Sequence, residues 1–281
     1  MYIGPIENHR GREAGTLVYP VYSRRSQGLS LGINLFPDHK QCSFDCPYCE
    51  VFPFEQDIRF SVADMEQQLL NELVRVRKQG IPVRDICFSG NGEPSCSSDF
   101  PRALEAAARI RDASAPEASL VLITNGTGLF NDHTFELLCR AASQGLKIWL
   151  KLDAGTPAWY ALMARSAVSF ERLILKIKEA VGRAPVTIQT MLCMVQGTPP
   201  PAAEAAAWER LVVELAGIGA AAGQGIEAIQ IYGKARPAPQ DPLAEALPVA
   251  YLEARAASLI RALRRFGPAN QRGAIPVQVF P

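Results

Sequence analysis

The chain has 281 residues, 48% of them hydrophobic and 20% charged, with a formal net charge of +1. This composition is typical of a folded protein with a large core, argues against a disordered chain, and gives no general electrostatic attraction to nucleic acid. No stretch reaches the ~20 apolar residues of a membrane-spanning helix and the first residues have no apolar signal-peptide core, so we expect a cytoplasmic protein without membrane contact.

Six short apolar runs alternate with longer segments of helical pattern. Strands are expected at 30–36, 83–90, 119–126, 146–155, 185–193 and 226–233. Helices are expected at 61–79, 99–112, 131–143, 169–181 and 202–222, with Ser61, Asp99, Asn131 and Ser169 as N-cap residues. Buried strands that alternate with helices predict an α/β fold with parallel strands, in which right-handed crossovers close or half-close a barrel.

The end of the chain is expected to form an appendage on this core. A further helix is predicted at 248–267, after the Pro-rich segment "KARPAPQDPLAEALP". We therefore predict a single domain over 1–281 of class α/β, a partial (β/α)6 TIM-type barrel of parallel strands with a C-terminal helical extension. The barrel core spans about 28–235, and the C-terminal helix and tail span about 243–281.

Three of the seven cysteines lie within "CSFDCPYC", at Cys42, Cys46 and Cys49. The odd count and the length of the chain argue against a disulfide framework and favour reduced, ligating or buried thiols. Three thiolates on one loop can converge on a cubane iron–sulfur cluster and leave its fourth iron open to another ligand. A structural zinc site formed by these cysteines and His39 is the alternative.

The stretch "FSGNGEPSCS" closes the second expected strand. Gly90 and Gly92 let the backbone turn sharply and approach a ligand closely, and the carboxylate of Glu93 suits an ammonium group. At the mouth of a parallel barrel such residues gather into active sites. An ordinary solvated turn is the alternative for Glu93.

Polar residues also follow the third and fourth expected strands. Asn125 stands in "ITNGTG", and "KLDAGT" contains Lys151 and Asp153. Lys151 and Asp153 lie two residues apart, so on a strand their side chains share one face. Asp153 can accept from hydroxyl groups and Lys151 can meet a carboxylate, while a surface salt bridge between them is the alternative.

The C-x3-C-x2-C spacing, with Tyr48 before the last cysteine, resembles that of the radical S-adenosylmethionine (SAM) superfamily. The resemblance implies a [4Fe-4S] cluster held by Cys42, Cys46 and Cys49, with SAM on the fourth iron. It also implies an enzyme that reductively cleaves SAM to a 5′-deoxyadenosyl radical, which abstracts hydrogen from a substrate. The residues then expected to bind SAM are Tyr48, Gly90, Gly92, Glu93, Asn125, Lys151, Asp153, Gln189 and Tyr232.

The same resemblance implies a reducing electron donor of the flavodoxin or ferredoxin type. Cys96 and Cys193 each fall near the carboxyl end of an expected strand. Either is a candidate hydrogen-atom donor or extra ligand, so both are candidate catalytic residues.

The stretches "FSGNGEPS", "TNGTG", "WLKLDAGT" and "IQIYGKARP" look like those of the radical SAM group that includes bacterial relatives of the wyosine tRNA-base synthases. The chain departs from this group in two ways. No cysteine precedes Cys42 to hold a second cluster, and "MARSAVSF" replaces the Arg-Pro pair that many members have after the fourth strand.

Three hypotheses therefore stay open. An enzyme acting on tRNA or a nucleotide predicts a basic rim, formed by Arg24, Arg25, Lys234 and Arg236. A radical SAM enzyme acting on a small metabolite or a peptide predicts a closed cavity of modest size. The third hypothesis is a non-catalytic iron–sulfur or zinc protein.

Overall fold

The computed structural model describes residues 15–264 and 274–281. These residues form two compact units. The first unit takes its residues from Met1–Cys42, Pro53–Thr124 and Gln144–Lys147, and the second from Ser43–Phe52, Asn125–Ser143 and Ile148–Pro281. The prediction of a single domain stays a prediction.

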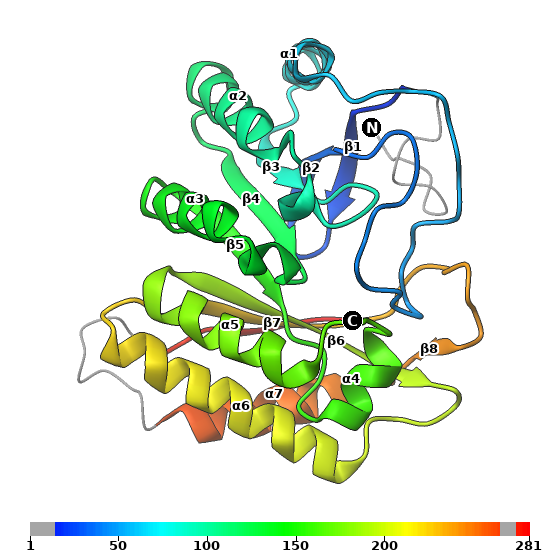
Figure 1. Cartoon of the computed structure of the whole chain (residues 1–281), viewed down its shortest axis with the longest axis vertical. Helices are drawn as coiled ribbons and strands as arrows, with labels where there is room; N and C mark the ends of the chain where they lie inside the picture. Colours follow the sequence, from blue (N-terminus) through cyan, green and yellow to red (C-terminus); the bar gives the residue numbers. More distant parts are fainter. Residues whose placement is uncertain (1–14, 265–273) are drawn as a thin grey trace. The chain divides into compact units, whose positions relative to one another are not determined.

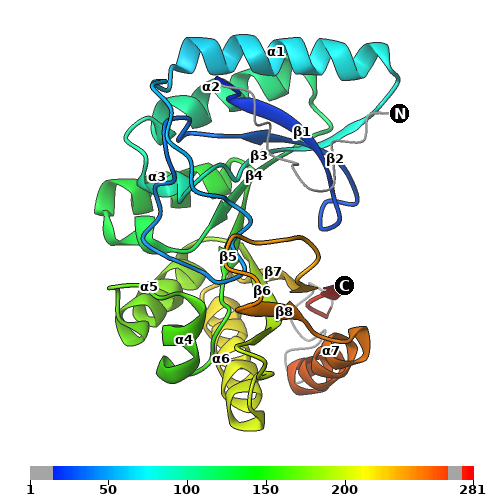
Figure 2. The ribbon, with the colours of Figure 1, turned by 90° about the vertical axis from the view of Figure 1, so that its right-hand side faces the viewer.

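The first unit is a four-stranded sheet with helices. Its strands are β1 (Val18–Ser23), β2 (Gly28–Ile33), β3 (Val83–Phe88) and β4 (Ser119–Thr124), in the order β1-β2-β3-β4. The β1–β2 pair is antiparallel, and the other two pairs are parallel. The α1 (Val62–Lys78) and α2 (Phe100–Ser114) helices pack side by side, and the 3₁₀ helix η1 (Pro94–Cys96) follows β3 (Figures 1 and 2).

The burial pattern of α1 explains how it docks. Met65, Leu69, Leu73 and Val76 are buried at spacings of three and four residues, which places them on one face of the helix. Ser61 begins the helix, because its side chain accepts a hydrogen bond from the Asp64 N–H.

The second unit contains the remaining strands, β5 (Leu146–Lys151), β6 (Val186–Val195), β7 (Ile226–Gly233), β8 (Ala244–Ala246) and β9 (Val277–Phe280). The order is β5-β6-β7-β9 with parallel neighbours, and β8 pairs antiparallel with β6. The first residues of β5 belong to the first unit.

The helices of the second unit are η2 (Thr127–Phe130), α3 (Asp132–Ser143), α4 (Pro157–Met163), α5 (Phe170–Arg183), α6 (Ala202–Ala221) and α7 (Val249–Leu263). The α5 and α6 helices lie side by side, and α7 packs on α6, β7 and β9 (Figure 1).

All six strands and all five inner helices expected from the sequence are present in the structure, and their alternation confirms the α/β class. The N-cap role is confirmed for Ser61 and Ser169, and the side chain of Asn131 accepts from the Thr134 N–H. Asp99 also occupies the N-cap position of α2, although its side chain makes no capping hydrogen bond. The last helix is described to Leu263, and residues 265–267 of its predicted range lie outside the described residues.

Among the described residues, the sequence patterns missed the short 3₁₀ helices η1 and η2, and also β1, α4, β8 and β9. The α4, β8 and β9 elements have three to seven residues, too few for a hydrophobic period to emerge. The β1 strand contains Pro20, which demotes a run to an edge strand, and β1 is the end strand of its sheet.

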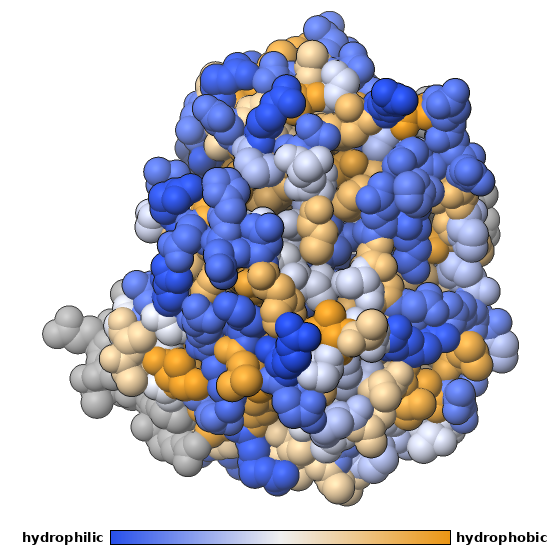
Figure 3. Space-filling model, viewed as in Figure 1, coloured by the Kyte–Doolittle hydropathy of each residue, from blue (hydrophilic) through white to orange (hydrophobic). Residues whose placement is uncertain are grey.

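The outer surface shows no extended apolar region on the face in Figure 3, where hydrophilic and apolar residues are interspersed. Within 15–264 and 274–281, no helix combines the length and the apolar character needed to cross a membrane.

Candidate functional site

The three clustered cysteines are not in disulfides, with Cys42 exposed and Cys46 and Cys49 half-buried. A backbone hydrogen bond of 3.0 Å from the Cys49 N–H to the Cys46 carbonyl closes the turn between the latter two. Burial raises the pKa of the Cys46 thiol well above its usual range, and the nearby Asp153 carboxylate adds to the rise. A thiol in such a place becomes a thiolate when a cation binds it.

The chemistry of this donor set fits an iron–sulfur cluster, because three cysteines lie on one loop. Among the described residues, no three His, Cys, Asp or Glu side chains are arranged around a common metal position. The described residues likewise show no zinc site formed by His39 and the cysteines. The ligand role of Cys42, Cys46 and Cys49 therefore stays a prediction.

Tyr48, between Cys46 and Cys49, is buried against the end of β5. Its hydroxyl donates to Asp153 Oδ2, which also pairs with Lys151 Nζ at 3.1 Å. The backbone N–H of Met191 donates to Asp153 Oδ1 at 2.8 Å. Asp153 lies two residues beyond the end of β5, but its side chain meets that of Lys151 as expected. The pair is mostly shielded from solvent, with side chains 13% and 10% exposed, and is not a surface salt bridge.

The electrostatics of this cluster keep Lys151 charged. Burial lowers the pKa of Lys151, but Asp153 and the hydrogen-bonded Tyr232 hydroxyl outweigh it, so the net pKa is raised. Burial and the Asp153 charge raise the pKa of Tyr48, which therefore stays a neutral donor. Lys151 Nζ also lies 4.8 Å from the ring centres of Tyr48 and Tyr232, a cation–π distance.

A row of polar residues continues from Lys151 across the sheet. Lys151, Gln189, Gln230 and Gln278 are successive register partners on β5, β6, β7 and β9. Gln189 is fully buried and donates to Gln230 Oε1 at 2.7 Å, and Gln230 donates to Gln278 at 3.4 Å. Sequence reasoning found Gln189 and missed Gln230 and Gln278, although glutamines inside two apolar runs were a readable signal.

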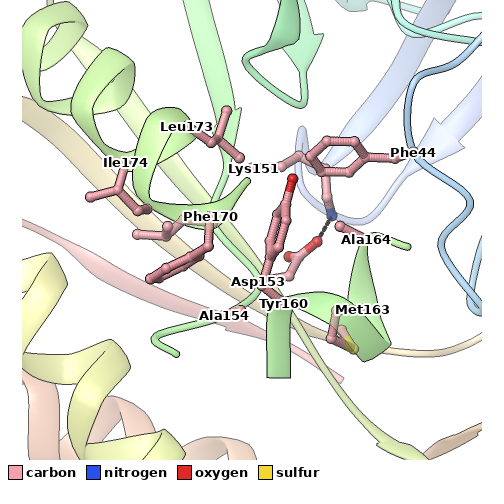
Figure 4. Close-up of a pocket in the computed structure, with 11 residues that line it drawn as sticks. Phe44, Lys151, Asp153, Ala154, Tyr160, Met163, Ala164, Phe170, Leu173 and Ile174 are labelled. Carbon is pink, nitrogen blue, oxygen red and sulfur yellow. Dashed lines mark ion pairs between the residues drawn. The ribbon is translucent and has the colours of Figure 1, made fainter. Parts of the chain in front are cut away.

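A pocket opens beside this cluster (Figure 4). Its walls are mainly apolar and come from the cysteine loop, the end of β5, α4 and α5; they include Phe44, Tyr160, Met163, Phe170, Leu173 and Ile174, with Lys151 and Asp153 at one side. The ring of Tyr160 packs edge-on against Phe44 at 5.8 Å and lies 5.6 Å from Phe170. An apolar hollow with a few polar groups is the usual form of a small-molecule site.

The Tyr160 hydroxyl is the polar group of this pocket that the chain leaves unsatisfied. It is buried and has no hydrogen-bond partner in the described part of the chain. Burial raises the pKa of the phenol, and the Ser166 hydroxyl offsets part of this rise without reaching hydrogen-bond geometry. An orphaned buried hydroxyl beside a charged pair fits a polar ligand such as SAM.

In the first unit, Glu93 is 3% exposed and is not a solvated turn residue. Its Oε1 accepts hydrogen bonds from the hydroxyls of Ser95 and Thr124, at 2.5 and 2.6 Å, and from the Ser95 N–H. These donors hold the carboxylate in one orientation. A fixed, buried carboxylate is suited to bind an ammonium group.

Gly90 and Gly92 allow close approach of the chain to itself. A Cβ atom on Gly92 would lie 1.9 Å from the Gln41 carbonyl oxygen, and one on Gly90 would lie 2.4 Å from Asn34 Cα. The Glu93 N–H donates to the same Gln41 carbonyl at 2.8 Å. Close packing within this unit therefore requires glycine at both positions. The sequence predicted a ligand contact for them and did not predict this packing role.

The other predicted residues differ in setting. Asn125 is buried, and its Oδ1 accepts from the N–H and hydroxyl of Thr127. Cys96 ends η1 and is exposed. Cys193 is fully buried in β6 beside Met163 Sδ at 4.0 Å, and burial raises its pKa to about 12. Cys193 thus resembles a core residue more than Cys96 does.

Sequence reasoning also missed Glu204, a buried carboxylate at the start of α6. It accepts hydrogen bonds from the Gly155 N–H and the Thr156 hydroxyl, just after β5. Trp208, one turn further along, donates to the Leu152 carbonyl at 3.1 Å. The α6 helix thereby holds the segment that carries Asp153.

Two of the residues expected in a basic rim are neutralised. Lys234 pairs with Asp241 at 2.9 Å, and Arg236 pairs with Glu50 at 3.3 Å. Burial raises the pKa of the Asp85 carboxyl, and hydrogen bonds from Ser26 and Ser30, with the nearby charge of Arg25, offset part of this rise.

The sequence profile of the radical SAM superfamily matches residues 37–200. This range is more than half of the 281 residues. The chain belongs to the radical SAM superfamily. The expectation of a member of the radical SAM superfamily is thereby confirmed, and membership implies SAM and an iron–sulfur cluster as cofactors.

Two solved radical SAM structures share the fold. A radical SAM methyltransferase from Sphaerobacter thermophilus aligns with a TM-score of 0.61 and 16% identity, over 93% of this chain and 68% of its own. SuiB from Streptococcus suis aligns with a TM-score of 0.60 and 14% identity, over 92% of this chain and 51% of its own. These likenesses confirm the predicted fold class, a partial TIM-type α/β fold.

Among curated proteins, a UPF0026 protein from Helicobacter pylori strain 26695 is 31% identical over 109 residues. A second one, from strain J99, is 30% identical over the same length. Each alignment covers 38% of this chain and 34% of the relative, so about a third of the curated relatives is matched.

Proposed function

We propose that the protein is a radical SAM enzyme in which Cys42, Cys46 and Cys49 bind three irons of a [4Fe-4S] cluster. When bound, the cluster and SAM supply a reductive cleavage that yields a 5′-deoxyadenosyl radical for hydrogen abstraction. The observation that carries the proposal is the superfamily match over 37–200, which contains these three cysteines.

The residues of the second unit have roles in binding and orientation. Lys151 is a buried cation with a high pKa, suited to the carboxylate of SAM, and its pairing with Asp153 keeps it at the end of β5. Asp153 already engages three groups of the chain, so about one of its four lone pairs remains for a ribose hydroxyl. Tyr48 stays protonated and holds Asp153 in place.

The remaining SAM contacts are proposed from the sequence motifs. Glu93 receives the ammonium group, a role supported by its burial and by the hydroxyls that orient it. Gly90, Gly92, Asn125, Gln189 and Tyr232 complete the proposed binding residues. The apolar pocket beside Tyr160 excludes water from the neighbouring groups, which strengthens their electrostatic interactions.

The proposal includes a reducing protein partner of the flavodoxin or ferredoxin type. It also places the chain near the bacterial relatives of the wyosine synthases, on the stretches "GNGEP", "TNGTG" and "KLDAGT". A substrate in tRNA draws less support than a small metabolite or peptide, because Lys234 and Arg236 are occupied by acidic partners.

Anaerobic reconstitution with iron and sulfide tests the proposal. We expect a brown protein with about four irons per chain that releases 5′-deoxyadenosine from SAM after reduction. Cys46→Ala should abolish the release, because one iron loses its thiolate. Cys139→Ala is the control, since this cysteine lies in α3, and it should leave the release unchanged. A colourless protein with one bound zinc, or an iron-loaded protein that leaves SAM intact, would contradict the proposal.

A further inference from the structure

Residues 43–52, which carry Cys46 and Cys49, contain no helix or strand. The turn bond between Cys49 and Cys46 orders the middle of this segment but does not attach it to the rest of the unit. Its position is therefore fixed mainly by side chains that flank the cysteines, together with one backbone hydrogen bond from Asp45. Phe44 and Tyr48 supply two attachments, to Tyr160 and to Asp153.

The Ser43 hydroxyl adds a hydrogen bond of 2.8 Å to the Thr127 hydroxyl, and two acidic residues next to the cysteines supply further attachments. Asp45 directly precedes Cys46, and Glu50 directly follows Cys49. Gln240 Nε2 donates to both carboxylate oxygens of Asp45, at 3.1 and 3.3 Å. Arg236 Nη1 lies 3.3 Å from Glu50 Oε2.

Both partners come from one short segment, residues 234–243, which joins β7 to β8. Within it, Asp241 pairs with Lys234 at 2.9 Å and accepts from the Ala238 N–H at 2.9 Å. At its end the Leu243 carbonyl accepts from the Gln196 N–H at 2.8 Å. The segment is thus tied internally and to the end of β6.

A third element completes the attachment at Asp45. Arg165, in the connection from α4 to α5, lies 3.6 Å from Asp45 Oδ2 and donates to Gln240 Oε1. The Asp45 N–H donates to the Ala164 carbonyl at 2.8 Å. Asp45, Arg165 and Gln240 therefore form a three-way contact in which each side chain holds the other two.

We propose that Arg236 and Gln240 are positioning residues for Cys46 and Cys49, which they hold through Glu50 and Asp45. This inference rests on the proposed function for the cysteines as cluster ligands. The attachment itself, however, is a property of the chain and can be measured without iron.

The energetics predict a local effect and not a global one. The Arg236–Glu50 side chains are 22% exposed, and Asp45 is 53% exposed. Ion pairs whose side chains are this exposed to solvent contribute little to the free energy of unfolding. A segment without regular structure opens separately from the core, so losing two of its attachments should raise its local opening.

The test compares the wild type with an R236A/Q240A variant. Hydrogen exchange on the iron-free protein should be about fivefold to tenfold faster in the amides of 43–52, with the unfolding midpoint unchanged. On the reconstituted protein, a ferrous chelator should remove iron faster by a similar factor. Lys178→Ala, which breaks a partly exposed pair with Glu214 on other helices, should change neither rate. Arg236→Glu alone and Glu50→Arg alone should each speed up hydrogen exchange in 43–52. The double variant R236E/E50R reverses the charges of the pair and should restore slow hydrogen exchange.

Unchanged exchange in 43–52 overturns the inference, whether or not iron is bound. Faster exchange with unchanged iron release overturns the role toward the cysteines and leaves the proposed function standing. A wild-type chain that takes up no iron overturns the proposed function, and the exchange result then decides the attachment by itself.

Discussion

Asp153 is a residue on which three groups of the site converge. Its carboxylate pairs with Lys151 and accepts from Tyr48 and from the Met191 N–H. The Lys151 ammonium group is mostly shielded from solvent, and the Asp153 carboxylate stabilises its charge. The residue thus joins the cysteine loop to the ends of β5 and β6.

Removing this carboxylate should cost much more than removing the hydroxyl that binds it. Asp153→Ala leaves the Lys151 charge buried without its ion partner, and we expect a loss of about 3–5 kcal/mol in the free energy of unfolding. Tyr48→Phe loses one hydrogen bond and should cost about 1 kcal/mol. Urea unfolding of the iron-free protein measures both.

The control is Glu136→Ala, which breaks a solvent-exposed pair with Arg183 and should cost much less than Asp153→Ala. If Asp153→Ala costs no more than this control, the buried cation is not stabilised by Asp153.

At the scale of elements, the segment after β5 is fixed by its contact with α6. Gly155 lies against the backbone of that helix, since a Cβ atom there would fall 2.0 Å from the Trp208 nitrogen. Glu204 and Trp208 add hydrogen bonds to Gly155 and Leu152. The close approach of strand end and helix therefore requires glycine.

Two glycine substitutions test this contact. Gly155→Ala forces the β5 end away from α6, and we expect destabilisation of about 1–3 kcal/mol because backbone atoms, unlike flexible side chains, yield little. Gly182→Ala, within α5, meets its first neighbour at 3.7 Å and should be neutral or stabilising by up to about 1 kcal/mol. Thermal unfolding of both variants measures the difference in stability. Equal shifts of the unfolding midpoint would show that the close approach of Gly155 to α6 does not require glycine.

At the scale of the whole molecule, the two compact units share the chain in an interrupted way. The chain changes unit at 42/43, 52/53, 124/125, 143/144 and 147/148, and the last change falls inside β5. Neither unit is a continuous segment. Such interleaving favours cooperative folding as the single domain predicted from the sequence.

Equilibrium unfolding with two probes tests this prediction. The three tryptophans, Trp149, Trp159 and Trp208, all belong to the second unit, so fluorescence reports on that unit alone. Far-ultraviolet circular dichroism reports on the helices and strands of both. We expect the two transitions to coincide in iron-free protein. Separate midpoints would mean that the units unfold independently.

Local sequence patterns determined the parts of this protein that depend on near neighbours. The spacing of two residues predicted that the side chains of Lys151 and Asp153 lie together, the alternation of apolar runs predicted the strands and helices, and the cysteine spacing indicated the superfamily. These properties follow from backbone geometry and donor chemistry, which a short stretch of sequence already contains.

Tertiary structure alone decided which distant groups meet. Glu50 and Arg236 are 186 positions apart, and the row from Lys151 through Gln189 and Gln230 depends on the register of three strands. No spacing rule links such residues, because their contact is a result of how the whole unit packs. The sequence predicted Asp153 as a binding residue. Only the fold shows that Asp153 also accepts a hydrogen bond from Tyr48 and so holds the cysteine loop.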